Sequence, residues 1–143
     1  MDTKSDREKV LNTNEIFYKA LGTRDLELMS TIWVKDQRAG CVHPGWVILR
    51  SWDAIKQSWE NIFDPEDQVD ISLSDVSVIV KGKFAWLTCV QQMLYIKRNP
   101  VTYNISQSTN IFEKIENDWF LIIHHASPIP DMRINEHSNT SIQ

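Results

Sequence analysis

Residues 69–96 read VDISLSDVSVIVKGKFAWLTCVQQMLYI, and this stretch decides the fold. Apolar and polar residues alternate from Val69 to Leu73 and again, on the opposite parity, from Val76 to Val80. A period of two residues is typical of a β-strand, so we expect one long strand here. The change of parity requires a bulge or bend near residues 74–75, and Lys-Gly at 81–82 predicts a hairpin turn.

Three more strands are expected downstream. Residues 83–96 are nearly continuously apolar, which is typical of a strand that is covered on both faces. Alternation resumes between residues 101 and 115, and a turn at 117–118 leads into a last strand over residues 119–127. The sequence therefore predicts a four-stranded antiparallel meander. Its strands are about twice the average length, and strands this long coil and bend strongly.

Helices are predicted before the sheet. Ser5 and Glu8 have the spacing of a capping box, and apolar residues then recur at helical spacing over residues 10–21. We expect Gly22 to end this helix and Thr23 to cap a second one.

A third helix has the clearest amphipathic pattern in the chain. Its apolar stripe consists of Trp52, Ile55, Trp59 and Ile62. A short strand over residues 39–43 would place Cys41 and His43 on one face. The expected fold class is α+β, with three N-terminal helices packed on a strongly bent antiparallel sheet. Such an arrangement forms a cone with a cavity at its wide end.

Composition limits the function. The 143 residues suit one domain, expected over residues 1–130, with a polar, mobile tail over 131–143. The net charge of −4 argues against nucleic-acid binding, which needs a basic face. Neither an apolar leader nor a run of about 18 apolar residues is present, so we expect a cytoplasmic protein without a membrane partner. The two cysteines are expected to be reduced, buried thiols, and four glycines cannot build a phosphate-binding loop.

The order of elements and several short motifs resemble the SnoaL-like branch of the NTF2-like superfamily, which includes ketosteroid-isomerase-like domains. The resemblance covers residues 8–128, and its landmarks are Thr23-Arg24-Asp25, Cys41-Val42-His43-Pro44-Gly45, Ser51-Trp52-Asp53-Ala54-Ile55 with Ser58-Trp59, and Trp119 through His125 to Ser127. It implies the cystatin-like cone. Function stays open, because the superfold hosts isomerases, cyclases, dehydratases, transport factors and binding modules.

The resemblance to ketosteroid isomerases is partial at the residues that do chemistry. The position of their proton-abstracting aspartate corresponds to His43, which is also followed by proline. The position of their first-helix tyrosine falls on Phe17, with Tyr18 as the nearest phenol. Their late-strand acid corresponds to Ser108, and residues 101–112 hold no carboxylate. Steroid isomerisation is therefore disfavoured.

His43 is the candidate catalytic residue. A neutral imidazole can accept a proton near neutral pH, so His43 could act as a general base. The favoured interpretation is that it lines a pocket without chemistry, and it could also cap the third helix or hydrogen-bond within the core. His124 and His125 are adjacent on a strand and point to opposite faces, so they cannot hold one metal ion together. We expect His125 to face inward, because it shares parity with Trp119, and no metal site is expected.

The leading hypothesis is a domain that binds a small, largely apolar molecule in an internal cavity without a cofactor. The expected pocket residues are Phe17, Tyr18, Trp33, Trp46, Trp59 and His125. One alternative is a cofactor-independent isomerase or dehydratase that uses His43 as acid and base. Another is an oligomerisation module with a filled interior.

A homodimer through the outer sheet face is the expected assembly. Many relatives pair in this way, and twofold pairing is the commonest oligomer. The residues expected on this face are Ser106, Ser108 and Asn110, with Trp86 or Leu87 nearby.

Overall fold

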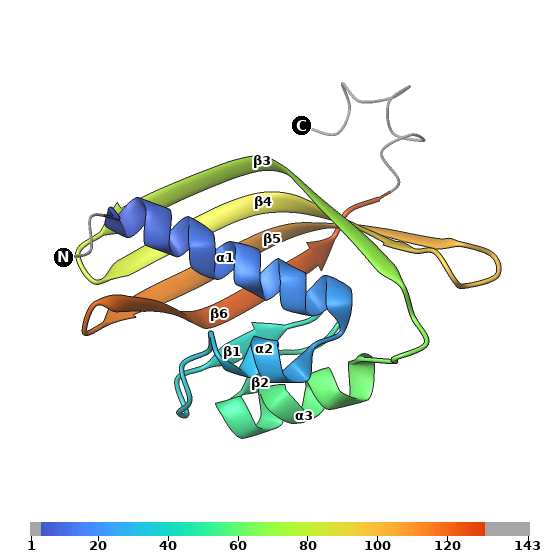
Figure 1. Ribbon diagram of the computed structural model, residues 1–143, viewed down its shortest axis with the longest axis horizontal. Helices are drawn as coiled ribbons and strands as arrows, with labels where there is room; N and C mark the ends of the chain where they lie inside the picture. Colours follow the sequence, from blue (N-terminus) through green and yellow to red (C-terminus); the bar gives the residue numbers. More distant parts are fainter. Residues whose placement is uncertain (1–3, 131–143) are drawn as a thin grey trace.

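One mixed sheet of six strands, in the order β2-β1-β6-β5-β4-β3, carries the fold (Figure 1). The computed structural model describes residues 4–130. The helices are α1 (Asp6–Thr23), α2 (Leu26–Ser30) and α3 (Trp52–Ile62). The strands are β1 (Gly40–Val42), β2 (Leu49–Arg50), β3 (Val69–Lys81), β4 (Phe84–Tyr95), β5 (Thr102–Ile115) and β6 (Asp118–Pro128).

Helix α1 begins where the capping box predicted it. The Ser5 hydroxyl accepts a hydrogen bond from the Glu8 backbone N–H at 3.1 Å. The helix ends one residue later than predicted, because it continues through Gly22 to Thr23. Arg24 then takes the left-handed conformation, with φ 59°, that stops the helix.

Asp25, and not Thr23, caps α2. Its carboxylate accepts the Leu28 backbone N–H at 2.9 Å, whereas the Thr23 hydroxyl bonds back to the Lys19 carbonyl. The two helices are therefore joined by two residues, the left-handed Arg24 and the capping Asp25.

The meander of β3 to β6 confirms the prediction from the alternation. The predicted break in β3 is a bulge, at which the register with β4 shifts between Ser74 and Ser77. Asp75 has φ 52° within this bulge. The bulge keeps Ile71 and Val78 on the inner face although their parities differ, and it bends the sheet.

A second bulge, which the sequence did not predict, lies between β5 and β6. The register shifts after Ile111 pairs with Ile123, because Phe112 pairs with Leu121 and Ile122 is left over. Leu121 and Ile122 are consequently both buried. Beyond Ile122, each side chain of β6 therefore lies on the sheet face opposite to the one expected from strict alternation starting at Trp119.

Strand β1 extends the sheet beyond the meander. It pairs in parallel with β6, with Cys41 beside His124, and antiparallel with the two-residue β2. The short strand was predicted within residues 39–43, but β2 and the parallel pairing were not. The sheet is therefore mixed and not purely antiparallel.

Helix α1 lies across the inner face of the long strands, while α2 and α3 lie beside β1 and β2 at one end (Figure 1). The core between these layers is rich in aromatic side chains. Phe17 of α1 is fully buried and contacts the ring of Trp33, whose centroid lies 6.4 Å away. Within residues 4–130, no helix has the length and apolar character needed to span a membrane.

Candidate functional site

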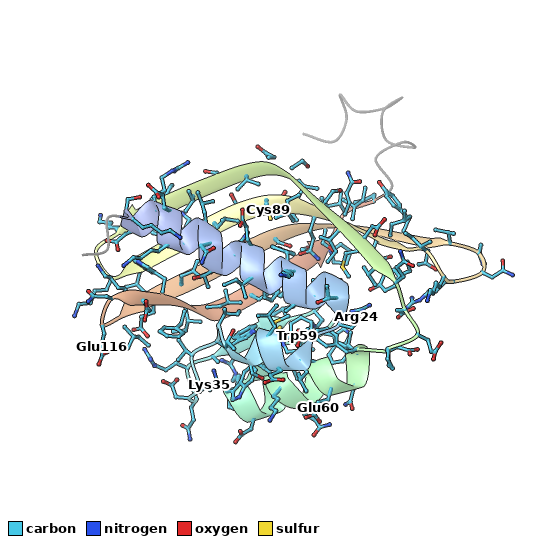
Figure 2. All side chains as sticks on the ribbon, in the orientation of Figure 1. Arg24, Lys35, Trp59, Glu60, Cys89 and Glu116 are labelled. Carbon is cyan, nitrogen blue, oxygen red and sulfur yellow. The ribbon has the colours of Figure 1, made fainter. Side chains whose placement is uncertain are left out.

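A partly open cavity of about 200 Å³ lies where the C-terminal end of α1, helix α3 and the inner face of the sheet meet. The labels of Arg24 and Trp59 in Figure 2 mark this end of the molecule. Its apolar and aromatic lining consists of Leu21, Pro44, Trp46, Trp59, Ile62, Met93 and Tyr95. Its polar lining consists of Arg24, His43, Gln91, Asn104 and His124.

His43 follows β1 and reaches α3 through a hydrogen bond. The Ser58 hydroxyl donates to the Ile55 carbonyl at 2.6 Å, so its only hydrogen is used there. Ser58 Oγ therefore accepts from His43 Nε2–H at 2.8 Å. This bond leaves His43 Nδ1 with a lone pair, and that atom can accept a proton or a hydrogen bond.

Two indole rings enclose the His43 imidazole. The Trp46 and Trp59 rings lie edge-on to it, with centroid distances of 4.8 and 4.5 Å. Burial among these rings lowers the pKa of His43 to about 4, because an apolar environment disfavours the charged form. The imidazole is therefore neutral at pH 7.

His124 is the second imidazole of the cavity, and Asn110 sets its tautomer. The Asn110 amide donates to Asn14 Oδ1 at 2.9 Å, so the carbonyl oxygen of Asn110 faces His124. That oxygen lies 2.6 Å from His124 Nδ1 and accepts its N–H. Nε2 is left as the basic atom. Burial, with a smaller contribution from the neighbouring His43 and His125, lowers the pKa of His124 to about 3.

A buried polar network joins the back of the cavity to α1. The Tyr18 hydroxyl donates to Gln91 Oε1 at 2.9 Å, and the Ser108 hydroxyl donates to the same oxygen at 2.7 Å. Burial raises the pKa of Tyr18, so its phenol stays protonated. Asn110 also donates to the Tyr18 oxygen at 3.4 Å, which connects Gln91 to His124. A network with each member satisfied fixes the positions of its side chains.

Arg24 lies at the end of the cavity, and its charged guanidinium group is buried. Only 4% of its side chain is exposed, and its guanidinium carbon lies 5.3 Å from the Phe63 ring centroid and 5.4 Å from that of Tyr95. Its Nη2 lies 3.7 Å from an Asp67 oxygen, which is beyond hydrogen-bond distance. Within residues 4–130, none of its three guanidinium nitrogens has a hydrogen-bond partner.

The structure places the predicted catalytic residue and the predicted pocket residues in different parts of the molecule. His43, Trp46 and Trp59 line the cavity together. Phe17 and Trp33 do not line it, because they fill the core between α1, α2 and the sheet. Tyr18 contributes to the polar network behind the cavity.

The prediction that His125 faces inward was wrong. His124 is only 1% exposed, whereas His125 is exposed on the opposite face. The bulge at Ile122 is the cause, since one extra residue reverses the faces of everything that follows it. Residues 119–123 are uniformly apolar, so no alternation marked the bulge in the sequence.

The prediction that Ser106, Ser108 and Asn110 lie on the outer sheet face was also wrong. All three are buried on the inner face, where the hydrogen bonds of Ser108 and Asn110 to distant elements satisfy them. Leu87 is likewise buried inside, and Trp86 alone of the predicted patch faces outward. Polar side chains normally face solvent, and they are buried here because they form hydrogen bonds with residues that are far away in the sequence.

Among the cavity residues that sequence reasoning missed, Arg24 and His124 carry a guanidinium and an imidazole. Arg24 belonged to a recognised motif, Thr23-Arg24-Asp25, but nothing near it in sequence indicated burial. Its aromatic neighbours, Phe63 and Tyr95, come from α3's end and β4.

A larger and more open groove of about 630 Å³ lies between α1 and β3. It is lined by Glu15, Tyr18, Lys19, Gly22, Thr23, Val69, Asp70, Ile71 and Leu73. Neither imidazole reaches it, so the candidate site is the smaller cavity. In the part of the chain that the structure describes, no three His, Cys, Asp or Glu side chains gather as metal ligands.

Known proteins share this fold and part of this sequence. The SnoaL-like domain family matches residues 10–132. The F-box protein SKIP8 of Arabidopsis thaliana is 24% identical over 118 residues, which are 82% of this chain and 48% of SKIP8. The chain thus spans about half the length of that relative.

Two solved structures show the same architecture. A proposed dehydratase of the NTF2-like family from Streptomyces avermitilis superposes with a TM-score of 0.78 and 28% identity, over 85% of this chain and 95% of that one. The CaMKII hub of S. rosetta superposes with a TM-score of 0.74 and 18% identity, over 90% of this chain and all of that one, a likeness of fold alone. The expected cystatin-like architecture is therefore present. With its family matched over most of its length, this chain belongs to the SnoaL-like domains of the NTF2-like superfamily.

Proposed function

We propose that this domain binds a small, largely apolar molecule in the cavity beside His43, without a cofactor. The supporting observation is a partly enclosed space of about 200 Å³ between the Trp46 and Trp59 rings and the apolar side chains of Ile62 and Met93. Ligand sites are typically concave, mostly apolar and equipped with a few oriented polar groups, and the two neutral imidazoles are such groups.

A thermal-shift titration with small aromatic molecules tests this proposal. Benzamide, indole, benzyl alcohol and benzoate span neutral and charged probes of suitable size. A probe at ten times its Kd adds about 1.4 kcal/mol to the free energy of unfolding, which raises Tm by about 5 °C.

A cavity-filling variant provides the matched control. Ile62→Trp should abolish the shift because the new indole occupies the cavity that Ile62 lines. Val101→Trp adds the same ring at an exposed position and should leave the shift unchanged. Failure of every probe to stabilise the wild-type protein would refute ligand binding.

Acid–base chemistry on the bound molecule is the second candidate function. Its support is the pair of imidazoles, His43 and His124, each with one nitrogen fixed as a donor by Ser58 or Asn110. His43 Nδ1 would take the proton from the carbon beside a carbonyl and return it to the β-hydroxyl oxygen, so that the C–O bond breaks, water leaves and a C=C bond forms. The low pKa of each histidine makes it a weak base in the empty cavity, so binding is the better supported function.

Dehydration of a β-hydroxy aryl ketone tests the second candidate. The conjugated enone product absorbs in the near ultraviolet, so turnover is measured directly. If His43 is the base, His43→Ala loses at least about 100-fold in kcat while Trp86→Phe, on the other face, loses none. Equal rates for wild type and His43→Ala would exclude a role for His43.

Self-association through the outer sheet face is our proposal for assembly. Apolar side chains of four neighbouring strands form one row there, because the register places Ile79 beside Trp86, Trp86 beside Ile111 and Ile111 beside Ile123. Ile79 and Trp86 are 47% and 38% exposed. A row of this kind on an open sheet face is typical of an interaction surface. The likeness to a CaMKII hub supports self-association of this domain. The alternative function, an oligomerisation module with a filled interior, would use the same sheet face.

Sedimentation equilibrium distinguishes the outcomes. We expect a dimer at micromolar concentration that Trp86→Glu converts to a monomer, because a charge would be buried in the interface. Val76→Glu, at an exposed position in the β3 bulge, should remain dimeric. A monomeric wild-type protein would contradict the dimer, and a larger ring would favour the oligomerisation module.

A further inference from the structure

Four buried hydrogen-bond donors at the cavity have no partner among the described residues. The three guanidinium nitrogens of Arg24 and the indole Nε1 of Trp59 are buried, and among residues 4–130 none of them finds a hydrogen-bond partner. Arg24 and Trp59 both line the same cavity. Burying a donor without an acceptor is unfavourable, and burying a charged one is more so, so a site that keeps four of them lacks a hydrogen-bond partner.

The Arg24 guanidinium also lies beside a carboxylate that hydrogen-bonds elsewhere. Asp67 binds Arg98 through two hydrogen bonds of 3.2 and 3.0 Å, and it approaches Arg24 only to 3.7 Å. Asp67 thus faces two guanidinium groups, Asp64 adds a second negative charge beside Arg98, and no carboxylate hydrogen-bonds to Arg24 among the described residues. An isolated buried charge is costly, and an anion would offset that cost.

No other charged group lines this cavity among the described residues. His43 and His124 are neutral at pH 7 because burial lowers the pKa of both. The Phe63 and Tyr95 rings flank the guanidinium at 5.3 and 5.4 Å and restrain its plane. The N–H groups of a guanidinium point outward in that plane, in a geometry that matches the two oxygens of a carboxylate.

We propose that the ligand of this cavity is a small carboxylic acid, with its carboxylate on Arg24 and its apolar body between Trp46 and Trp59. The inference rests on the proposed ligand-binding function and specifies its chemical class. The size of the cavity limits the acid. At about 200 Å³, it exceeds the roughly 150 Å³ of an engineered cavity that holds benzene and falls below the range for drug-sized ligands. An aromatic or short branched monocarboxylate fits these limits.

The test compares benzoate with benzamide, which has nearly the same shape but no charge. We expect benzoate to bind wild-type protein at least about tenfold more tightly in a calorimetric or NMR titration. Arg24→Met keeps the aliphatic stem and should remove this preference, so that the two probes bind within about twofold of each other. Arg24→Lys keeps the charge without the planar fork and should give an intermediate preference.

Arg50→Met is the matched control for net charge. Arg50 is exposed on β2 and does not line the cavity, so the preference for benzoate should persist. If Arg24→Met does not fold, Arg24→Lys still decides, because an unchanged preference there would show that the fork does not hold the carboxylate.

The failures of the two proposals are distinguishable. Equal binding of benzoate and benzamide to the wild-type protein would overturn the carboxylate inference and leave ligand binding intact. A preference for benzoate that survives in Arg24→Met would overturn it as well. Binding of neither probe, nor of indole or benzyl alcohol, would overturn both.

Discussion

His124 and Asn110 are register partners on β6 and β5, and His124 Nδ1 donates to Asn110 Oδ1 across 2.6 Å. This pairing makes Nε2 the basic nitrogen of His124. We predict that ¹⁵N NMR at pH 7 shows His124 neutral, with its proton on Nδ1. A signal from the charged imidazolium would contradict the neutral state, and a neutral ring with its proton on Nε2 would contradict the orientation of Asn110.

The same hydrogen bond makes Asn110 important for stability. Asn110→Ala leaves His124 Nδ1 and the Asn14 side chain without their partner in a dry interior. We expect the free energy of unfolding to fall by about 1–3 kcal/mol. Chemical denaturation measures the change, and Ser127→Ala, at an exposed position of β6, should change it by about 0.5 kcal/mol or less.

Acid should destabilise the protein through its buried histidines. The pKa of His43 is lowered from 6.5 to about 4 in the folded state. Between these two pH values the unfolded chain therefore binds a proton at His43 that the folded chain does not bind. Stability from this group is fully present above pH 6.5 and is lost as the pH falls towards 4. A shift of this size corresponds to about 3 kcal/mol, and His124 adds to the loss in the same direction.

Denaturation midpoints between pH 7.5 and 4 measure this loss. His43→Gln should flatten the dependence on pH, whereas Trp86→Phe, which removes no titratable group and lies on the outer sheet face, should leave it unchanged. A wild-type protein equally stable at pH 4.5 and 7 would contradict neutral burial of the two imidazoles.

The two thiols should be inert in the folded protein. Cys41 and Cys89 are fully buried, and burial raises the pKa of both. We predict no reaction with a thiol-specific chromogenic reagent at pH 8 under native conditions and two equivalents in denaturant. Rapid native labelling of either cysteine would show that the sheet opens near His43 or Tyr18.

Trp33 and Trp46 should respond differently to truncation. Trp33 is 1% exposed in the core, so Trp33→Ala should cost about 3–5 kcal/mol of stability. Trp46 is 47% exposed at the cavity, so Trp46→Ala should cost far less and weaken ligand binding. Thermal melts with and without benzoate separate the effects, and the reverse order of stabilities would contradict the placement of both rings.

Local patterns predicted the meander because alternation reports which face of a strand is buried. The parity change at residues 74–75 was visible, since polar residues stand on both sides of it. The bulge at Ile122 was hidden by a uniformly apolar run, and its one extra residue moved the inward histidine from position 125 to 124. A register is thus predictable only where the alternation itself is unambiguous.

The polar interior could not be predicted from such patterns. Asn110 and Ser108 lie inside because Asn14, Tyr18 and Gln91 satisfy them from other elements. Arg24 is buried for a similar reason, since its flanking rings come from α3's end and β4. Tertiary contacts of this kind leave no periodic trace in the sequence.

The indole resonances provide the most direct test of a ligand in the cavity. Titration of ¹⁵N-labelled protein with benzoate should shift the indole N–H signals of Trp46 and Trp59, which line the cavity. The signals of Trp86, on the outer sheet face, and of Trp119, whose Nε1 donates to Asp6 at 3.0 Å, should stay in place. Shifts confined to Trp86 or Trp119, or no shift at saturating benzoate, would contradict a ligand site between α3 and the sheet.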